Sequence, residues 1–355
     1  MYSYFTPVID DRPTQLRAAV EDVLLIESMR TEQGGVTFTG QLRDDAERAF
    51  RVLSRRFGQM GYTPLMRRRR GVDEVVAVEG TVGVKPSNWV INVLLFLATV
   101  TSVVLVGRQL YSWSGAVVFM LGLLTVLGVH EFGHYLVARV HGMSVTLPYF
   151  IPLPLPPLGT MGAFIRLKSP VENRKALFDM AIAGPLAGFL AALPIFVLGL
   201  LLPIEWLRFL QQPRPLLLPL PAESRLIQTL IDLLLPTAGR LDLFRNPLTA
   251  VGWFGMLVTA INLLPAGQLD GGHIAYSVLG RWARPASLLT FFVLLVLGFL
   301  YWNGWWVWAF LLLITGMNHP MPLNDITRLD WPRFLIAAFT FILFLLIITV
   351  RPFAM

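Results

Sequence analysis

Residues 113–138 read WSGAVVFMLGLLTVLGVHEFGHYLVA, and this stretch decides the fold class. It is longer than the ~20 apolar residues that a helix needs to cross the hydrocarbon core of a bilayer. Its one acidic side chain, Glu131, lies beside His130 and three residues before His134. Ionisable residues inside a span are costly, and they mark a functional site unless a partner compensates them. The stretch therefore predicts a transmembrane helix that carries chemistry.

The composition of the whole chain indicates a membrane protein. Hydrophobic residues make up 55% of the 355 residues and charged residues 14%, against about 25% charged in an ordinary soluble domain. So few charges exclude a purely soluble enzyme, a coiled coil and a disordered chain. Further apolar stretches bring the expected number of spans to about seven. They are residues 89–106, 177–202, 248–264, 286–301, 305–317 and 334–350.

The first part of the chain has the composition of a soluble domain. Residues 1–88 hold 13 Arg or Lys and 12 Asp or Glu, a charge density well above that of the remainder. Alternation predicts strands over 35–39, 63–69 and 74–79, and helical spacing predicts helices over 15–29 and 44–57. We therefore expect a small cytoplasmic α/β domain over 1–84, followed by an all-α transmembrane domain over 85–355. The chemistry is expected to need only the second domain.

Basic residues in the short loops predict the orientation. They follow the second span and precede the fifth and the seventh, and they are Arg166, Lys168, Arg174, Lys175, Arg281, Arg284, Arg328 and Arg333. The positive-inside rule then places the N-terminus in the cytoplasm and the chain in the cell (inner) membrane as a multi-pass protein. The net charge of +7 is attributed to contact with the membrane rather than with nucleic acid.

Within the second span, the sequence HEFGH has the spacing of a zinc site. His130 and His134 are four residues apart on one helix face, so their imidazoles can bind the same metal ion. Glu131 lies one position on, where it can take a proton from a metal-bound water without occupying a coordination site. A catalytic zinc ion needs one further protein ligand.

Two aspartates in apolar surroundings are candidates for that ligand. Asp270 follows Pro265 and precedes two glycines, and this pattern breaks a helix and lets a carboxylate turn inward. Asp179 lies near the start of the third span, where an acidic residue complements the helix dipole. The sequence therefore favours Asp270.

With these residues in place, the sequence resembles the site-2 protease family of intramembrane zinc metalloproteases. The family signatures HExxH and NxxPxxxLDG match residues 130–134 and 262–271, and its glycine element matches GPLAG at 184–188. The stretches GTMGAFIR at 159–166 and NRKALFD at 173–179 look closest to a bacterial and plastid branch. That branch includes the plant ethylene-dependent gravitropism-deficient proteins.

The resemblance implies the roles of the site residues. His130, His134 and Asp270 would hold one zinc ion per chain, Glu131 would activate the water, and Asn262 would hold the substrate backbone or its oxyanion. The implied reaction is the hydrolysis of peptide bonds in or near the transmembrane segments of membrane proteins within a lipid bilayer. Such regulated intramembrane proteolysis would add an upstream protease as a partner.

The resemblance also implies a six-span-type protease core with a membrane-associated hairpin over 143–168, which is too rich in proline for a helix. Residues 161–167 alternate enough to offer an edge strand to a substrate, although a plain connecting loop explains them equally well. An amphipathic piece over 223–235 is expected on the membrane surface.

Two other functions remain as alternatives. A membrane metal-ion transporter also suits facing His and Asp residues, but it needs neither Glu131 nor a hairpin. A non-catalytic, chaperone-like relative is disfavoured because all the expected site residues are present. Of the other histidines, we expect His273 to cap or pack and His141 and His319 to lie at interfaces.

Overall fold

The computed structural model describes residues 11–32, 34–81, 83, 86–202, 209–211, 224–235 and 245–353. The protein is mostly helical and divides into two compact units. The first comprises Met1–Val84, Ser169–Lys175 and Met321–Arg328. The second comprises Lys85–Lys168, Ala176–Pro320 and Leu329–Met355.

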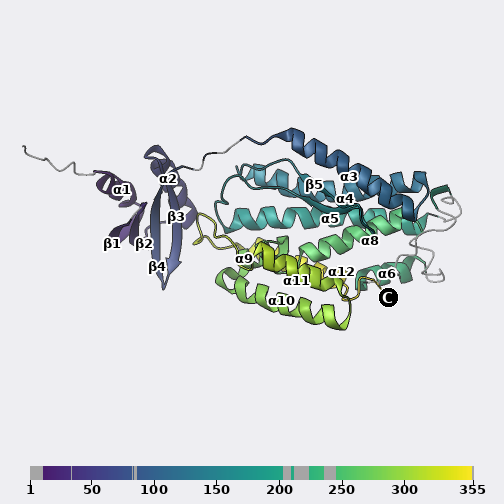
Figure 1. The fold of residues 1–355 in the computed structure, drawn as a ribbon. Helices are drawn as coiled ribbons and strands as arrows, with labels where there is room; N and C mark the ends of the chain where they lie inside the picture. Colours follow the sequence, from purple (N-terminus) through teal and green to yellow (C-terminus); the bar gives the residue numbers. More distant parts are fainter. Residues whose placement is uncertain are drawn as a thin grey trace, which may run out of the picture. The chain divides into compact units, whose positions relative to one another are not determined.

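The first unit is built on a four-stranded antiparallel sheet (Figure 1). Its strands are β1 (Leu24–Glu32), β2 (Gly35–Leu42), β3 (Tyr62–Arg69) and β4 (Val72–Glu79), in the order β1-β2-β4-β3. Alternate residues of β2, β3 and β4 are buried, because successive side chains of a strand point to opposite faces. The buried face shares one core with helices α1 (Arg12–Val20) and α2 (Ala46–Gln59). This core includes Leu16, Phe38, Leu53, Phe57 and Met66.

Local signals explain much of this unit. The Asp45 carboxylate accepts hydrogen bonds from the backbone amides of Glu47 and Arg48, which caps the start of α2. Arg70 and Gly71 both have positive φ, 51° and 86°, as a two-residue hairpin turn between β3 and β4 requires. The predicted strands at 35–39, 63–69 and 74–79 and the predicted helix at 44–57 are confirmed.

The predicted helix over 15–29 is wrong in its second half. Helix α1 ends at Val20, and Leu24–Glu32 form the edge strand β1. Strand β1 pairs with β2 from Leu24 opposite Leu42 to Glu32 opposite Gly35. Pairing with β2 and burial of Leu24 therefore outweigh the local helical spacing, because propensity is a weak term against tertiary contacts.

In the second unit, the part of the chain described by the structure contains four helical stretches long and apolar enough to cross a membrane. They are α3 (Trp89–Leu110), α4 (Trp113–Val140), α5 (Arg174–Leu201), whose first two residues belong to the first unit, and Asp270–Leu300. The last stretch combines α9 (Asp270–Leu279), η2 (Gly280–Trp282) and α10 (Ala283–Leu300). Three shorter apolar helices are α8 (Pro247–Asn262), α11 (Gly304–Thr315) and α12 (Trp331–Ile347). All seven predicted stretches overlap these helices, but the count of seven spans is not confirmed.

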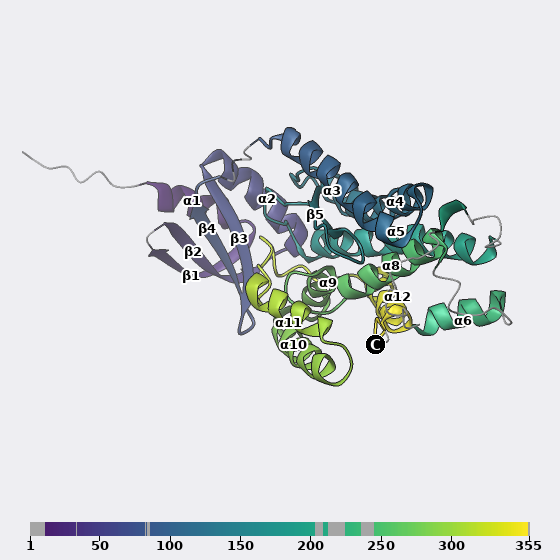
Figure 2. The ribbon, with the colours of Figure 1, turned by 45° about the vertical axis from the view of Figure 1, so that its right-hand side comes forward.

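The core of the second unit lies among α4, α5 and α8, which run side by side in Figures 1 and 2. It is filled by large side chains that include Phe119, Leu123, Phe196, Trp253 and Phe254. Residues 143–168 contain an antiparallel hairpin of β5 (Tyr149–Pro152) and β6 (Thr160–Phe164), in agreement with the prediction that they form no helix. The amphipathic piece contains α6 (Arg225–Leu234), and most of residues 203–245 lie outside the described part.

Candidate metal centre

Helix α4 carries the first half of the site. His130, Glu131 and His134 are all buried, although a glutamate is almost never buried unless it is paired. The four-residue spacing puts both imidazoles on one face of the helix, and their Nε2 atoms lie 3.2 Å apart. Two nitrogens at this distance, with their rings inclined by 71°, can bind the same ion.

Asp270 supplies the second half of the site because the helical backbone is interrupted just before it. Helix α8 ends at Asn262, and α9 begins at Asp270. A Cβ on Gly271 would collide with the carbonyl oxygen of Leu263, and one on Gly272 would collide with that of Gly267. Only glycine fits at these two positions, as expected where two stretches of backbone approach closely. The break turns the Asp270 carboxylate toward α4, as the sequence predicted.

Three donor atoms from these elements form a nearly equilateral triangle. Asp270 Oδ2 lies 3.2 Å from His130 Nε2 and 3.3 Å from His134 Nε2, and the third side is the 3.2 Å between the two nitrogens. Zinc–nitrogen bonds of about 2.0–2.1 Å in a tetrahedron separate neighbouring ligand atoms by about 3.3 Å. The three residues therefore fit one zinc ion and leave its fourth position open.

Helix α5 supports the histidines from the side. His134 Nδ1 donates a hydrogen bond of 2.8 Å to the carbonyl oxygen of Met180. Because a carbonyl only accepts, the proton is on Nδ1, and the lone pair of Nε2 points to the donor triangle. Gly184 and Gly188 pass so close to the rings of His134 and His130 that a Cβ at either position would overlap them. The spacing of the GPLAG element is thus explained by contact with the two imidazoles.

The other two predicted site residues lie beside the triangle. Asn262 Nδ2 is 3.3 Å from His130 Nε2, so the amide group reaches the metal position from the end of α8. Glu131 contributes no atom to the triangle. Strand β6 of the hairpin packs against α4, the helix that carries Glu131.

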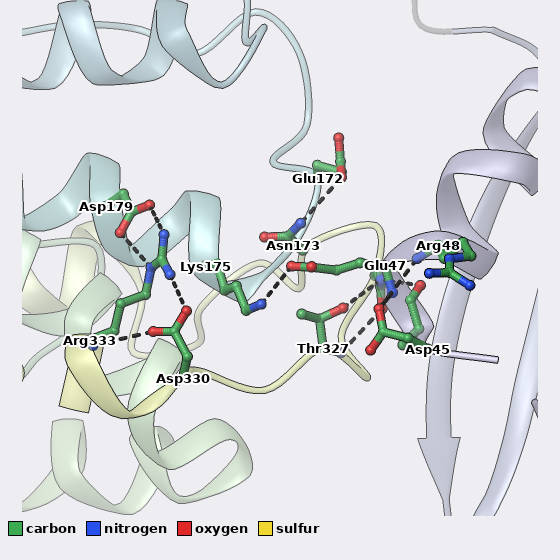
Figure 3. A network of polar contacts seen from close by, with 12 residues as sticks. Asp45, Glu47, Arg48, Glu172, Asn173, Lys175, Asp179, Thr327, Asp330 and Arg333 are labelled. Carbon is green, nitrogen blue, oxygen red and sulfur yellow. Dashed lines mark hydrogen bonds and ion pairs between the residues drawn. The ribbon is translucent and has the colours of Figure 1, made fainter.

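Asp179, the rival candidate, lies in a different cluster. Its carboxylate accepts two hydrogen bonds from Arg333, of 2.7 and 2.6 Å, and His141 Nε2 lies 3.0 Å from it. Arg333 also contacts Asp330, the N-cap of α12 (Figure 3). This network joins the C-cap of α4 to the beginnings of α5 and α12. His141 lies at an interface as expected. The first turn of α5 holds no acidic residue, so the predicted helix-dipole role of Asp179 is wrong, and its carboxylate is instead bound by Arg333.

His273 and His319 form a contact that could not be predicted from the sequence. Nδ1 of His273, one turn after Asp270, meets Nε2 of His319, and Tyr276 stacks on His319 with ring centroids 4.5 Å apart. Both histidines pack at an interface between α9 and the segment after α11, as their expected roles require. Their separation of 46 residues explains why no local pattern reveals the pair.

A comparison with models of protein families shows to which family the chain belongs. The model of peptidase family M50 matches residues 118–300, just over half of the chain and the part that contains all five predicted site residues. The chain belongs to peptidase family M50. This membership confirms the resemblance to site-2 proteases.

Three curated relatives of the chain are plant proteins. One is the probable chloroplastic zinc metalloprotease EGY2 of Oryza sativa subsp. indica, 30% identical over 284 residues that cover 73% of this chain and 51% of the relative. The Arabidopsis thaliana EGY2 is 39% identical over 168 residues, covering 46% and 29%. The EGY1 protein of Oryza sativa subsp. japonica is 34% identical over 243 residues, covering 65% and 40%.

The chain thus spans about half the length, or less, of the curated relatives it matches. No solved structure matches it. These relatives agree with the predicted bacterial and plastid branch.

Proposed function

We propose that this chain is an intramembrane zinc metalloprotease that hydrolyses peptide bonds in or near the transmembrane segments of other membrane proteins. The observation that carries the proposal is the triangle of His130, His134 and Asp270, with its edges of 3.2–3.3 Å. Membership of peptidase family M50 and the printed names of the relatives as zinc metalloproteases support it.

The residues around the triangle supply the remaining groups that peptide hydrolysis needs. His130, His134 and Asp270 would hold the zinc ion; with two neutral imidazoles and one carboxylate around it, the ion would keep a net positive charge and would polarise a carbonyl and make a water acidic near neutral pH. Glu131 accepts a proton from the water that attacks the carbonyl carbon, and it returns this proton to the amine nitrogen when the C–N bond breaks. The Asn262 amide donates a hydrogen bond to the oxyanion that forms in between.

The β5–β6 hairpin suits an extended substrate. Among the described residues, β6 pairs in a sheet with β5 alone, and β6 packs against α4, the helix that carries Glu131. A peptide that adds to the other edge of β6 would pass beside Glu131 with its carbonyls exposed. A helical substrate keeps its carbonyls in internal hydrogen bonds, so it must unwind before it is cut.

The location and partners follow from the same proposal. The basic loops support a position in the cell (inner) membrane with the N-terminus in the cytoplasm. Seven spans result if the three shorter apolar helices also cross the bilayer. The substrates are membrane proteins, and an upstream protease supplies some of them in a trimmed form.

Replacing Glu131 by glutamine tests the proposal. Glu131→Gln keeps the size of the side chain and all three donor atoms, so zinc should stay bound while cleavage of a synthetic transmembrane peptide is lost. Glu21→Gln, at an exposed ion pair, is the control and should cleave normally. Cleavage by Glu131→Gln at the native rate would refute the assigned role. A metal transporter, the alternative that no relative supports, would instead keep its zinc flux in vesicles.

A further inference from the structure

Three buried polar side chains lie on the apolar helix α3. They are Asn92, Thr99 and Ser102, with exposed fractions of 5%, 0% and 4%. Thr99 donates a hydrogen bond of 2.8 Å to the carbonyl oxygen of Leu95 in its own helix, whereas the other two bind a different element. A polar side chain is costly within an apolar span unless it has a partner. The bonds to that element explain why Asn92 and Ser102 occur in α3.

Both side chains bind the β5–β6 hairpin. Asn92 Nδ2 donates to the carbonyl oxygens of Leu147 and Pro148, at 2.8 and 3.0 Å, directly before β5. Because both partners only accept, the nitrogen of the amide faces them. Ser102 Oγ donates to the carbonyl oxygen of Gly159, at 2.6 Å, directly before β6. Two side chains of one helix thus bind the beginning of each strand.

The spacing of these two side chains matches the length of β5. Ser102 follows Asn92 by ten residues, which is about 15 Å along a helix at about 1.5 Å per residue. The carbonyl oxygen of Gly159 also accepts from the amide of Leu153. Leu153 follows Pro148 by five residues, or about 16 Å along a strand at about 3.3 Å per residue. Helix α3 therefore follows β5 from end to end, and it lies beside β5 in Figures 1 and 2.

Two close contacts add to these hydrogen bonds. Phe96 of α3 packs edge-on against Phe150 of β5, with ring centroids 5.1 Å apart. Gly159 has a φ of 75°, and a Cβ on it would lie 2.7 Å from the Cα of Val103. A side chain at this position would push the hairpin away from the helix, so glycine is required there. The hairpin is thus fixed on α3 at both ends of β5 and between them.

The second strand carries this position to the helix of the metal centre. Strand β6 pairs with β5 in a defined register, with Phe150 opposite Ala163, and it packs against α4. The ladder couples the two strands, so fixing β5 on α3 also fixes β6 along α4. A peptide that pairs with the free edge of β6 takes its register from that strand. A slip that keeps the same side chains on the same face must be of two residues.

We propose that α3 is a positioning element for the substrate strand. Through Asn92 and Ser102 it fixes the hairpin beside α4, and the hairpin then sets which peptide bond of a substrate reaches the metal position. Neither side chain belongs to the donor triangle, so both act on where the substrate is cut and not on the hydrolytic step. The proposal rests on the proposed function for the pairing of a substrate with β6.

Replacing the two donors in the full chain tests the proposal. Asn92→Leu and Ser102→Ala each remove the bonds to the hairpin, and Ser102→Thr keeps the hydroxyl and should behave as the native chain. Thr101→Val is the matched control, because Thr101 is exposed and its hydroxyl bonds to the carbonyl oxygen of Leu97 in its own helix. Gly159→Ala disturbs the same contact from the side of the hairpin, and it serves if a change in α3 prevents folding.

Hydrogen–deuterium exchange over residues 149–164 is the first measurement. We expect Asn92→Leu and Ser102→Ala to raise exchange there about two- to tenfold, the usual net effect of a hydrogen bond. Zinc affinity by chelator competition should be unchanged, because no atom of the donor triangle is touched. For a synthetic transmembrane peptide, kcat/KM should fall by up to about 100-fold, as for a substrate displaced by about 1 Å. Mass spectrometry should find additional cuts two residues from the native one.

Photo-crosslinking provides a readout that needs no cleavage. A transmembrane peptide with one photoreactive residue is bound to chains that also carry Glu131→Gln. It should crosslink to a single position within residues 160–167 when α3 is native or carries Thr101→Val. The crosslinks should spread to positions two residues away when Asn92 or Ser102 is replaced.

A loosened hairpin whose cuts and crosslinks keep the native register would overturn the proposal, since the two side chains would then support the fold alone. Unchanged exchange over residues 149–164, or the absence of any crosslink to residues 160–167, would overturn it as well. A failure of the proposed function is distinguishable, because it would appear as a native chain that binds no zinc or cuts no peptide. Exchange and crosslinking decide the positioning role in that case too.

Discussion

Replacing Gly184 by alanine adds one methyl group at the point where α5 touches the metal centre. An ideal Cβ at this position would lie 2.5 Å from Cε1 of His134 and closer still to Nε2 and Cδ2. Unstrained carbon atoms stay about 3.5 Å apart or more, so the ring or the helix must move by about 1 Å. Bound zinc tolerates deviations of only about 0.2 Å in its ligand distances. We therefore expect Gly184→Ala to displace His134 from the donor triangle.

Zinc affinity should fall about 100-fold or more. This is the upper end of the losses in metal affinity that follow when a group that orients a metal ligand is changed. Intrinsic helix propensity acts in the opposite direction, because alanine stabilises a helix interior by about 1 kcal/mol relative to glycine. A loss of metal therefore cannot come from a weakened helix. The assay is chelator competition, with total zinc by mass spectrometry and helicity by circular dichroism.

Gly128→Ala is the matched control for this change. Gly128 lies in α4 two residues before His130, and a Cβ there would meet no atom within 4 Å. This variant should bind zinc and cleave as the native chain does. Native zinc affinity and native cleavage in Gly184→Ala would refute the account of why α5 carries a glycine at this position.

Three further expectations follow from the same structure. Asp270→Ala should lose stoichiometric zinc because it removes one of three donors, whereas Asp179→Ala should keep it; undiminished zinc in the first variant would exclude Asp270 as a ligand. The hydrogen bonds and charge of Arg56 lower the pKa of Asp22 in the folded domain, so the pair contributes stability that is present above the usual carboxyl pKa of about 3.9 and is lost as the pH falls through the lowered value. Between neutral and acid pH, the Asp22→Asn variant should lose less thermal stability than the native chain does. The same dependence of the unfolding temperature on pH in both proteins would contradict this. Gly or Pro in a substrate span should speed cleavage, because they lower helix stability by about 1 and 3 kcal/mol relative to Ala and the substrate must unwind before it is cut; a cleavage rate that does not change when these residues are replaced by Leu or Ala would contradict this.

Local patterns were sufficient wherever the geometry is local. The spacing of His130 and His134 places them on one helix face in any α-helix, so their proximity needed no knowledge of the fold. The break before Asp270 was readable because Pro265 and the two glycines that follow Asp270 act on their own backbone. Length and apolar content likewise indicated the helices of the membrane part.

Tertiary contacts determined the features of the fold and the site that local patterns do not indicate. The sequence alone favoured Asp270 over Asp179, but the triangle of donor atoms exists only because α8 and α9 pack against α4. Residues 24–32 became a strand because β2 was available to pair with them, against their helical spacing. Residues 321–328 carry no local signal of their pairing with β3, since Met66 and Asn324 lie 258 positions apart along the chain. Periodicity reports which face of an element is buried; which distant segment covers that face depends on contacts that form only when the whole chain has folded.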